Sequence, residues 1–587
     1  MSENSFWDKF TQARVTRRRA LQMAAVGGAS AGAIAVVGCS SGGGDKNKTP
    51  AAGKSTASEG TPRPGGTFHY TIPLVTGKDP HPASLFIPHA FGSLSYSRLM
   101  RFKTTVGELA QKDRYTAVFE LAAKMENPDP LTYIFTLRSD AKFHDVPPTN
   151  GRAVVAQDIV NSYQRYASIS PNKGNFTEIV DSVTASTDGT QVTFKLKSPF
   201  SLFLNRVASY QDLWIIPQEL VDAKQTEEKT VGSGPFIFES FEAGKGGKWR
   251  RNPSYFEKDA AGAALPYLEG FELILIPDPN QVLSQFAAGQ LDSIFVDPKL
   301  VASLKSQSPN AVIDAAPRNI LNFLYFEPAT FTSQKPPFND ERVRQGFSRA
   351  IDREGLLNLA SPDKGKWPNM PISPGFSEYW WLDPQGKEIG DAGKHYQYDV
   401  AEAKKLFKAA GVETINVPMH FSSNVYTIAV PYYETLRQAL PAMLKQAGVT
   451  VKDVPEEYFS VYGPKTFAGQ FDGFALGLES VFSDLGAYWT NMFYPRNAGG
   501  GRNHSSVNDT TLNERIKKML ALQDVEALRK EGFELQKYLS EKMYYVPVIN
   551  PVEYTARQPK LKGVVNTQGP TTYALGTEGI LTNWFEA

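Results

Sequence analysis

The sequence predicts an α/β protein with mixed sheets that folds as more than one domain. Its 587 residues exceed the length of one ordinary domain and predict two or three. Strand patterns with alternating apolar residues, such as Gly66–Ile72 and Leu131–Arg138, occur together with helical patterns such as Pro337–Leu356. Chains that combine the two patterns over this length form layered α/β lobes.

The most regular helical pattern is Pro337–Leu356. Asn339 is the expected N-cap, and two acidic residues follow it in the first turn, where the helix dipole favours negative charge. Apolar residues recur at helical spacing and predict one buried stripe, namely Val343, Phe347, Ala350 and Ile351. Three arginines fall outside the stripe and are expected to face solvent, namely Arg342, Arg344 and Arg349.

Residues 1–38 have the pattern of a signal peptide. A charged start is followed by the small and apolar run Ala24–Val37, which is shorter than the roughly 20 residues of a membrane-spanning helix. Thr16–Leu21, with three consecutive arginines, is similar to a twin-arginine signal. Residues 1–38 carry five basic and two acidic side chains, so their removal changes the formal net charge from +1 to −2. A body this close to neutral offers no basic stripe for nucleic acid.

Cys39 is the single cysteine of the chain, which excludes disulfides and cysteine-based metal or nucleophile sites. Val36-Val37-Gly38-Cys39 is similar to a lipobox, in which the cysteine is lipidated and becomes the first mature residue. Such an anchor would hold the protein to a membrane face without spanning it. The rest of residues 39–65 is rich in Gly, Ser, Thr and Pro and predicts a flexible tether. We therefore expect an exported lipoprotein, periplasmic or at the cell surface.

Several short segments, in order along the chain, closely resemble marks of the family 5 extracellular solute-binding proteins. These are the oligopeptide- and dipeptide-type receptors of ABC importers. The resemblance extends over about residues 66–565 and is carried by Phe143-His144-Asp145, Gly232–Phe236, Arg251–Tyr255, Ala287–Asp292, Pro337–Arg353, Tyr398–Phe407 and Leu535–Ile549. The residues contain no repeat with a period of 20 to 50, so a repeat array is not expected.

The resemblance implies a two-lobed clamshell of the periplasmic-binding-protein type (type II) with an additional third domain. The N-terminal lobe is expected at residues 66–310 plus 541–587, with the extra domain at about 96–224, and the second lobe at 311–540. The chain would cross between the lobes twice, and its closing strands around Val546 and Tyr554 would pack on the first lobe. The expected function is capture of a peptide or peptide-like solute in the cleft by a monomer, and its delivery to ABC permease subunits without chemistry and without a cofactor.

Two aromatic clusters are the candidate ligand contacts. They comprise Tyr379, Trp380 and Trp381 in one segment, and Phe482, Tyr488 and Trp489 in another. Aromatic side chains are also common in protein cores, so one interpretation is that these residues only pack there. By resemblance, however, both segments face the cleft, where aromatic rings supply large and rigid contact area. Both interpretations stay open.

The peptide receptors of this family hold the ligand's ammonium group with an aspartate in the motif Trp-x-x-Asp-x-x-Asp-Pro. The matching stretch is Leu478–Leu485, where the amine-binding position is Val481 and the second aspartate is Asp484. A buried ammonium without a carboxylate partner costs several kcal/mol. Either Glu479 or Asp484 therefore substitutes, or the ligand has no free amino terminus. Phe421–Tyr426 corresponds to the stretch that clamps a ligand carboxylate in the family, but it contains no arginine. Longer peptides, saccharides and other small solutes therefore remain as alternative ligands.

Enzyme motifs are weak in this chain. Gly28–Gly32 spells a nucleophile elbow but lies in the signal, and Ser361–Lys364 fits Ser-x-x-Lys but suits a loop. The seven histidines show no spacing typical of a zinc site, and His144 is expected to brace the turn with Asp145. We therefore expect no enzyme and no metal site. The alternatives are the same scaffold binding a saccharide or a metal complex, and a secreted hydrolase.

Overall fold

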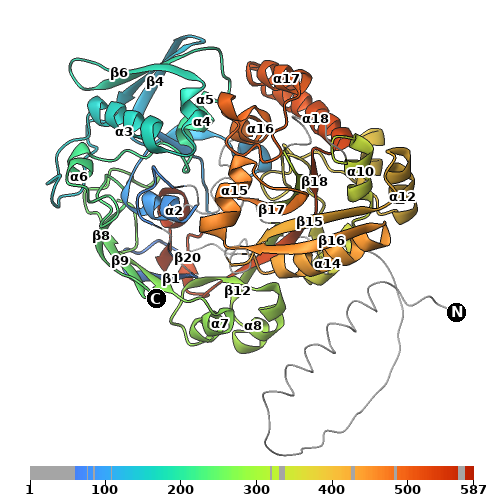
Figure 1. Ribbon diagram of the computed structural model, residues 1–587. Coiled ribbons are helices and arrows are strands. Elements are labelled where there is room, and N and C mark those ends of the chain that lie inside the picture. Colours follow the sequence, from blue (N-terminus) through green and yellow to red (C-terminus); the bar gives the residue numbers. More distant parts are fainter. Residues whose placement is uncertain are drawn as a thin grey trace, which may run out of the picture. The chain divides into compact units, whose positions relative to one another are not determined.

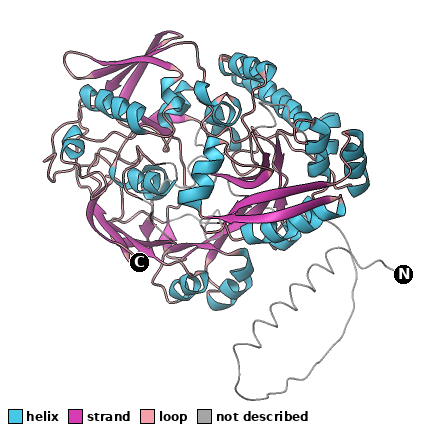
Figure 2. Ribbon diagram, viewed as in Figure 1, coloured by secondary structure: helices cyan, strands magenta, loops and turns pink. Residues whose placement is uncertain are grey.

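The computed structural model describes residues 60–586 with a few internal gaps. The gaps are residues 74, 76, 84–85, 107–108, 318–319, 329–336, 425–429, 481–484 and 566–575. The expected signal peptide, Cys39 and the tether up to residue 59 lie outside the described residues. Figure 1 shows the course of the chain and Figure 2 the distribution of helices and strands.

The strand predicted at Gly66–Ile72 is β1 (Thr67–Ile72), which lies in the middle of a mixed sheet. It pairs in parallel with β10 and β11, whereas the outer strands pair antiparallel. The strand order is β12-β19-β11-β1-β10-β9-β8, and β14 pairs with β19. The other strands of this first sheet are β8 (Phe236–Glu242), β9 (Gly246–Arg251), β10 (Gly270–Leu275), β11 (Ser293–Val296), β12 (Val312–Pro317), β14 (Gly365–Lys366) and β19 (Asn550–Arg557).

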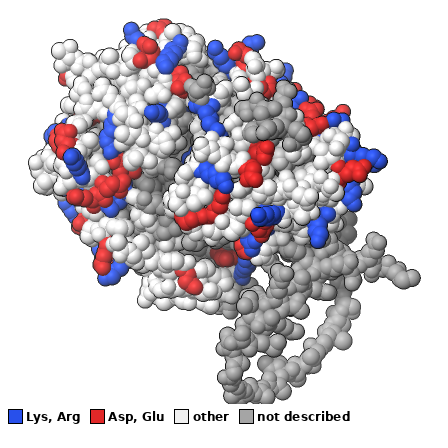
Figure 3. All heavy atoms as spheres, viewed as in Figure 1, with Lys and Arg blue, Asp and Glu red and all other residues white. Residues whose placement is uncertain are grey.

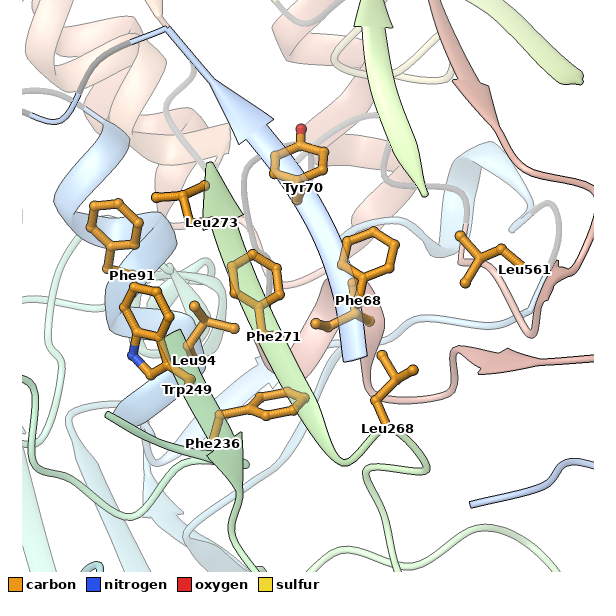
Figure 4. Close-up of a cluster of buried hydrophobic side chains, with 11 residues drawn as sticks. Phe68, Tyr70, Phe91, Leu94, Phe236, Trp249, Leu268, Phe271, Leu273 and Leu561 are labelled. Carbon is orange, nitrogen blue, oxygen red and sulfur yellow. The ribbon is translucent and has the colours of Figure 1, made fainter. Parts of the chain in front are cut away.

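Aromatic side chains fill the space between the first sheet and helix α2 (Phe86–Ser95). The Phe91 ring of α2 stacks on Trp249 of β9 at 5.7 Å, and Trp249 meets Phe271 of β10 edge-on at 5.8 Å (Figure 4). A second apolar cluster includes side chains of helices α7 (Pro279–Ala287) and α8 (Val301–Gln307). Each fully buried side chain of this size contributes roughly 1.5–3 kcal/mol.

A separate antiparallel sheet, β4-β5-β7-β6, is formed by residues between β1 and β8. The predicted alternation at Leu131–Arg138 is confirmed in β5 (Thr132–Leu137), because Tyr133 and Phe135 are buried. The other elements of this extra domain are β4 (Ala122–Asp129), α3 (Ala156–Ile169), α4 (Gly174–Thr177), β6 (Val180–Ala185), β7 (Gln191–Leu196), α5 (Phe203–Ala208) and α6 (Gln218–Asp222), with the short pair β2 (Met100–Phe102) and β3 (Ala117–Phe119) and the turn η1 (Gln111–Asp113).

The third large sheet has the order β16-β15-β17-β13-β18. Its strands are β13 (Ile320–Phe326), β15 (Ile415–Ser422), β16 (Val449–Glu456), β17 (Phe474–Ser480) and β18 (Tyr545–Pro547). The helices of this second lobe are α10 (Glu341–Arg349), α11 (Arg353–Ala360), α12 (Val400–Ala409), α14 (Tyr433–Gln446), α15 (Gly463–Ala468), α16 (Leu485–Phe493), α17 (Thr510–Leu520) and α18 (Val525–Lys542). In Figure 1, α10, α12, α14 and α18 lie on the side away from α3 and β4, whereas α16 lies next to α4 and α5.

The chain passes directly from the first sheet to the second-lobe sheet between β12 and β13 and back between β18 and β19, and we call these two connections the crossings; the short β14, between β13 and β15 in sequence, also returns to pair with β19. Two buried amides join these crossings: Asn322 Nδ2 donates to the Ile549 carbonyl at 3.1 Å, and Asn550 Nδ2 donates to the Ile320 carbonyl at 3.0 Å. Tyr554 lies in β19 of the first sheet. Val546, expected on the first lobe, instead pairs with β13 in the second-lobe sheet, because the chain crosses back only after β18.

The predicted single helix at Pro337–Leu356 is instead two helices, α10 and α11, with a break at Ala350–Asp352, and the predicted apolar stripe is fully buried. Two further details of the prediction are wrong. The N-cap is Asp340 instead of Asn339, since its side chain accepts from the Arg342 amide. Arg344 is buried, because its guanidinium donates to the carbonyls of Phe338, Asn339 and Lys542.

His144 does not pair with Asp145 in the described contacts but joins two segments of the first lobe. Its Nε2 lies 3.0 Å from the Gly234 carbonyl, and its Nδ1 accepts from the Gly232 amide at 3.4 Å. Gly234 in turn donates to the Ser95 carbonyl at the end of α2 at 2.8 Å. A Cβ at Gly234 would lie 2.6 Å from the Ser95 carbonyl carbon, so this close approach requires glycine.

Candidate functional site

The first predicted aromatic cluster packs against α18. Tyr379 Oη donates to Glu526 Oε1 at 2.5 Å, and the Arg529 guanidinium lies 4.7 Å from the centre of the Tyr379 ring. The Trp380 ring meets Tyr379 edge-on at 5.1 Å. Tyr379 is half-buried, whereas Trp380 is buried. These contacts fix the loop on the second lobe.

Trp381 lies on the other side of this loop, beside Lys366, whose Nζ is 5.2 Å from the centre of the indole. Lys366 also pairs with Glu378. The indole N–H groups of Trp380 and Trp381 are buried and have no hydrogen-bond partner among the described residues. A buried N–H without an acceptor is costly, so an acceptor on a bound molecule would stabilise either ring.

The second predicted cluster lies on α16, and the structure describes two of its three members. Tyr488 and Trp489 are each 1% exposed. The Tyr488 ring meets Phe376 edge-on at 4.8 Å, so it joins the loop that carries the first cluster. Trp489 instead packs beside Phe493 and near Gly532 of α18. Phe482 lies outside the described residues.

Glu479, at the end of β17, is 2% exposed and faces two basic side chains. Its Oε1 lies 3.7 Å from Arg502 Nε, and its Oε2 lies 3.3 Å from His504 Nε2. Burial lowers the pKa of His504, so the imidazole is neutral at pH 7 and Arg502 supplies the balancing charge. Val481 and Asp484, the positions compared with the amine-binding motif, lie outside the described residues.

A set of contacts that the sequence did not predict joins the extra domain to the second lobe. The Tyr115 and Phe376 rings lie 4.3 Å apart, and Asn491 Nδ2 donates to Asn175 Oδ1 at 2.6 Å. The Glu378 amide donates to Gln111 Oε1 at 3.1 Å. We call these three pairs the rim contacts. No spacing or motif could have identified them, because each joins single residues more than 250 positions apart.

The second lobe is connected to the rest of the protein in two ways, by the crossings and by the rim contacts. The crossings connect the first sheet to the second-lobe sheet covalently, and the rim contacts connect the extra domain to α16 and its neighbouring loop without a covalent link. Ligand contacts in a cleft between two such parts exist together only when the parts approach each other.

Charged side chains of both signs are interspersed over the face of the molecule in Figure 3. Within the described parts of the chain, no group of three or more His, Cys, Asp and Glu side chains is placed to hold a metal ion. None of the helices found there combines the length and the apolar character that crossing a membrane would require.

The family model of the bacterial extracellular solute-binding proteins, family 5 Middle, matches residues 116–500. The chain belongs to this family. The predicted resemblance is therefore confirmed, and solved family structures confirm the two-lobed α/β fold. DppA from Helicobacter pylori, in complex with the peptide STSA, has a TM-score of 0.73 at 20% identity over 89% of this chain and 99% of that chain. AppA from Bacillus subtilis, in complex with a nonapeptide, has a TM-score of 0.71 at 20% identity over 90% and 100%.

Curated relatives of this family 5 protein carry different ligand names. The oligopeptide-binding protein AppA of Bacillus subtilis is 24% identical over 74% of this chain and 78% of its own length. The heme-binding protein A of Haemophilus influenzae is 23% identical over 90% of this chain and 94% of its own length. Membership of this extracellular family therefore establishes solute binding. It does not determine the solute, because the relatives are named for different ligands.

Proposed function

We propose that this family 5 protein captures a peptide or peptide-like solute between its lobes and delivers it, chemically unaltered, to the permease of an ABC importer. The observation that carries the proposal is that the two sheets are joined by a pair of strand crossings, whereas the extra domain and α16 are joined by noncovalent contacts, an arrangement that would let the two parts separate and close again. A permease can recognise the closed form of the receptor independently of the chemistry of the bound solute. No catalytic step and no cofactor is required, and the working unit is a monomer.

The peptide assignment is supported by relatives whose names specify oligopeptides and dipeptides. It is also supported by the fold shared with receptors solved with a tetrapeptide sequence and with a nonapeptide. The buried indole N–H groups of Trp380 and Trp381 suit a ligand rich in carbonyl oxygens, because a peptide backbone supplies an acceptor at every residue.

For the ligand's ammonium group we assign Asp484 in preference to Glu479. The Glu479 carboxylate already faces Arg502 and His504, so its charge is balanced within the second lobe. Replacement of Asp484 by asparagine removes the negative charge but keeps the size of the side chain. We expect Asp484→Asn to weaken binding of a peptide with a free amino terminus by at least about tenfold, and to leave an amino-acetylated form of the same peptide unchanged. Equal affinities for both peptides in both proteins would remove Asp484 from the site.

The remaining proposed ligand contacts are Tyr379, Trp380, Trp381, Phe482, Tyr488 and Trp489. Among the described ones, Trp380, Trp381 and Tyr488 have the strongest support, since both indole N–H groups lack a partner among the described residues and Tyr488 touches the loop that reaches the rim. Trp489 has the weakest support, because its contacts are with Phe493 and α18.

We further propose that residues 1–38 direct export and that lipidated Cys39 anchors the mature chain to a membrane face, in the periplasm or at the cell surface. The lipobox-like Val36–Cys39 and the Gly- and Ser-rich stretch after it support this arrangement. Mass spectrometry of the mature amino terminus tests it. A diacylglyceryl adduct on Cys39 is expected, and an unmodified cysteine or a retained signal would contradict the anchor.

Native mass spectrometry of the protein as purified tests the proposed ligand class. We expect one bound molecule per chain whose fragmentation gives a peptide series. A bound heme, saccharide or metal complex would overturn the peptide assignment but leave the binding function, whereas a hydrolysed product would overturn both.

A further inference from the structure

A buried chain of polar side chains leads from the extra domain to α16 of the second lobe. Asp212 Oδ1 accepts from Tyr166 Oη at 2.7 Å and from Asn175 Nδ2 at 2.8 Å. Asn175 Oδ1 accepts from Asn491 Nδ2 at 2.6 Å. Asp212, Asn175 and Asn491 are 1%, 4% and 3% exposed. The link between the lobes is therefore shielded from water, where a hydrogen bond is stronger and its loss more costly.

The orientation of the Asn175 amide is determined by Asp212. A carboxylate only accepts hydrogen bonds, so the Asn175 group that faces it must be the NH₂. The carbonyl oxygen of the same amide then has to face Asn491. The backbone of Asn175 is held as well, because its carbonyl accepts from the buried Arg206 guanidinium. Asn175 thus presents a fixed acceptor to the second lobe.

Asn491 is placed by the helix that carries it. Its Nδ2 also donates to the Ala487 carbonyl one turn earlier at 3.1 Å, which orients the amide along α16. Immediately beside this pair the backbones come close, since a Cβ at Gly174 would lie 3.1 Å from the Cα of Gly499. The two amides therefore meet only when α16 and α4 are in contact.

We propose that Asp212, Asn175 and Asn491 form a latch, in which Asp212 presents the Asn175 carbonyl to Asn491 and thereby holds the lobes closed. The proposal rests on the proposed function, and its consequence is that the residence time of a bound solute depends on residues that do not touch the solute. Loss of one such hydrogen bond corresponds to a closed state that is roughly two- to tenfold less favoured.

If the latch holds the lobes closed, substitutions at positions 491 and 212 should compensate each other, which simple packing does not predict. Asn491→Asp places an acceptor against the Asn175 carbonyl, which cannot turn away while Asp212 requires its NH₂. The additional change Asp212→Asn supplies a donor at position 212, so the Asn175 amide can turn and donate to the new carboxylate. The double variant should therefore recover much of the closure that Asn491→Asp loses, because positions 212 and 491 are linked through the Asn175 amide.

Electron paramagnetic resonance of the full chain tests closure directly and needs no ligand. The single natural cysteine is removed by Cys39→Ala, and spin labels are placed at the exposed positions Thr187→Cys and Lys517→Cys, one in the extra domain and one on α17. We expect Asn491→Asp to shift the distance distribution to longer values, Asn491→Ala to shift it less, and the double variant to return toward the parent. Asn416→Asp, the same change at an exposed position of β15, is the matched control.

A second measurement follows dissociation of a pool of alanine-based peptides from dipeptide to nonapeptide. We expect Asn491→Asp to accelerate release by roughly tenfold and Asn491→Ala by about two- to tenfold, with unchanged melting temperatures of the ligand-free protein. The latch is overturned if Asn491→Asp matches Asn416→Asp, if the double variant is no better than the single one, or if only the melting temperature falls. If the label distances respond but no peptide binds, the latch stands and the peptide assignment fails. Asn491→Ala keeps both tests decisive should the aspartate variant not fold.

Discussion

Buried polar groups occur in two settings in this molecule, and the settings differ in what their hydrogen bonds connect. Inside the lobes, the Arg353 guanidinium donates to carbonyls of Ser348, Tyr396 and Pro547, and His144 bonds to Gly234. At the rim, the Asn491 amide donates to the Asn175 amide oxygen, and this bond joins the second lobe to the extra domain. The first setting holds each lobe together at all times, whereas the second exists only while the lobes touch.

Maintaining the shape of a lobe and controlling the approach of the two lobes therefore depend on different chemical groups. Groups inside the lobes include histidines and arginines whose ionisation is altered by burial. The contact atoms of the two rim amides do not titrate. We call the buried polar groups inside the lobes the framework. The stability of the framework and the closure of the lobes should therefore respond differently to pH and to substitution.

The largest expected effect is acid destabilisation of the framework. Burial lowers the pKa of His81 and His144 to about 4 and of His89 to about 3. Below their ordinary pKa of about 6.5 the unfolded chain binds protons that the folded chain does not, so stability is present above that pH and is lost as the pH falls toward the folded values. Three such groups would give a slope of about 4 kcal/mol per pH unit at the steepest, and buried Glu120, whose pKa is raised to about 8, opposes it by about 1 kcal/mol per pH unit.

Urea denaturation at pH 7, 6 and 5 measures this loss. Spin-label distances across the rim, recorded over the same range below the unfolding midpoint, should change less, because the two amides that meet there do not titrate and the latch has one titratable member, Asp212. An unchanged urea midpoint between pH 7 and 5 would show that these histidines are not buried as neutral groups.

The next largest effect is expected from Arg353→Ala. The guanidinium makes five hydrogen bonds inside the second lobe, and burial lowers its pKa to about 10. Removing it leaves several buried carbonyls without donors, at an expected cost of about 3–5 kcal/mol in the free energy of unfolding. The exposed Arg342→Ala, which loses only its pairing with Asp340, is the control and should have no measurable effect. Equal midpoints for the two variants would contradict the framework role of Arg353.

A smaller framework effect is expected from Gly234→Ala. The new methyl group would meet the backbone of Leu94 and Ser95 at less than 3.0 Å, which should cost about 1–3 kcal/mol. Gly532→Ala is the matched control, because its methyl group would have a nearest neighbour at 3.7 Å and would favour the helix. Thermal unfolding of both variants measures the difference, and a Gly234 variant as stable as the parent would show that α2 can move aside.

The smallest effect is expected at the rim, from Phe376→Leu. This change removes the ring that meets both Tyr115 and Tyr488, and should weaken closure by about 0.5–1.5 kcal/mol. Release of bound peptide should accelerate while the melting temperature of the ligand-free protein changes little. A large fall in that melting temperature with unaltered release would place Phe376 in the framework instead.

Much of the framework could be predicted from the sequence, because its signals are local. The alternation of Tyr133 and Phe135 correctly predicts β5, and the helical spacing of apolar residues correctly predicts the buried stripe of α10. Arg344 was predicted to be exposed because periodicity describes the chain's own helix and carries no information on the distant Lys542 carbonyl that the guanidinium meets. His144 was misassigned for the same reason, since its partner Gly234 is 90 residues away.

The candidate site could be predicted only in part. The aromatic segments were identified from their clustered rings and from the family resemblance, and Phe376 and Tyr488 do bring the two segments together. The rim could not be found, because a pair such as Asn175 and Asn491 is separated by 316 residues and neither side chain has a distinctive sequence setting. Asp484, the proposed partner of a ligand amine, was reached through a motif comparison and stays a prediction.

In the proposed function, the two lobes close around a small solute and release it chemically unaltered. Small-angle X-ray scattering of the ligand-free protein, before and after addition of the molecule recovered from it by native mass spectrometry, measures this closure. A decrease in the radius of gyration on addition, with the molecule recovered afterwards at its original mass, is the predicted result. An unchanged radius of gyration, or a molecule recovered in cleaved form, would contradict it.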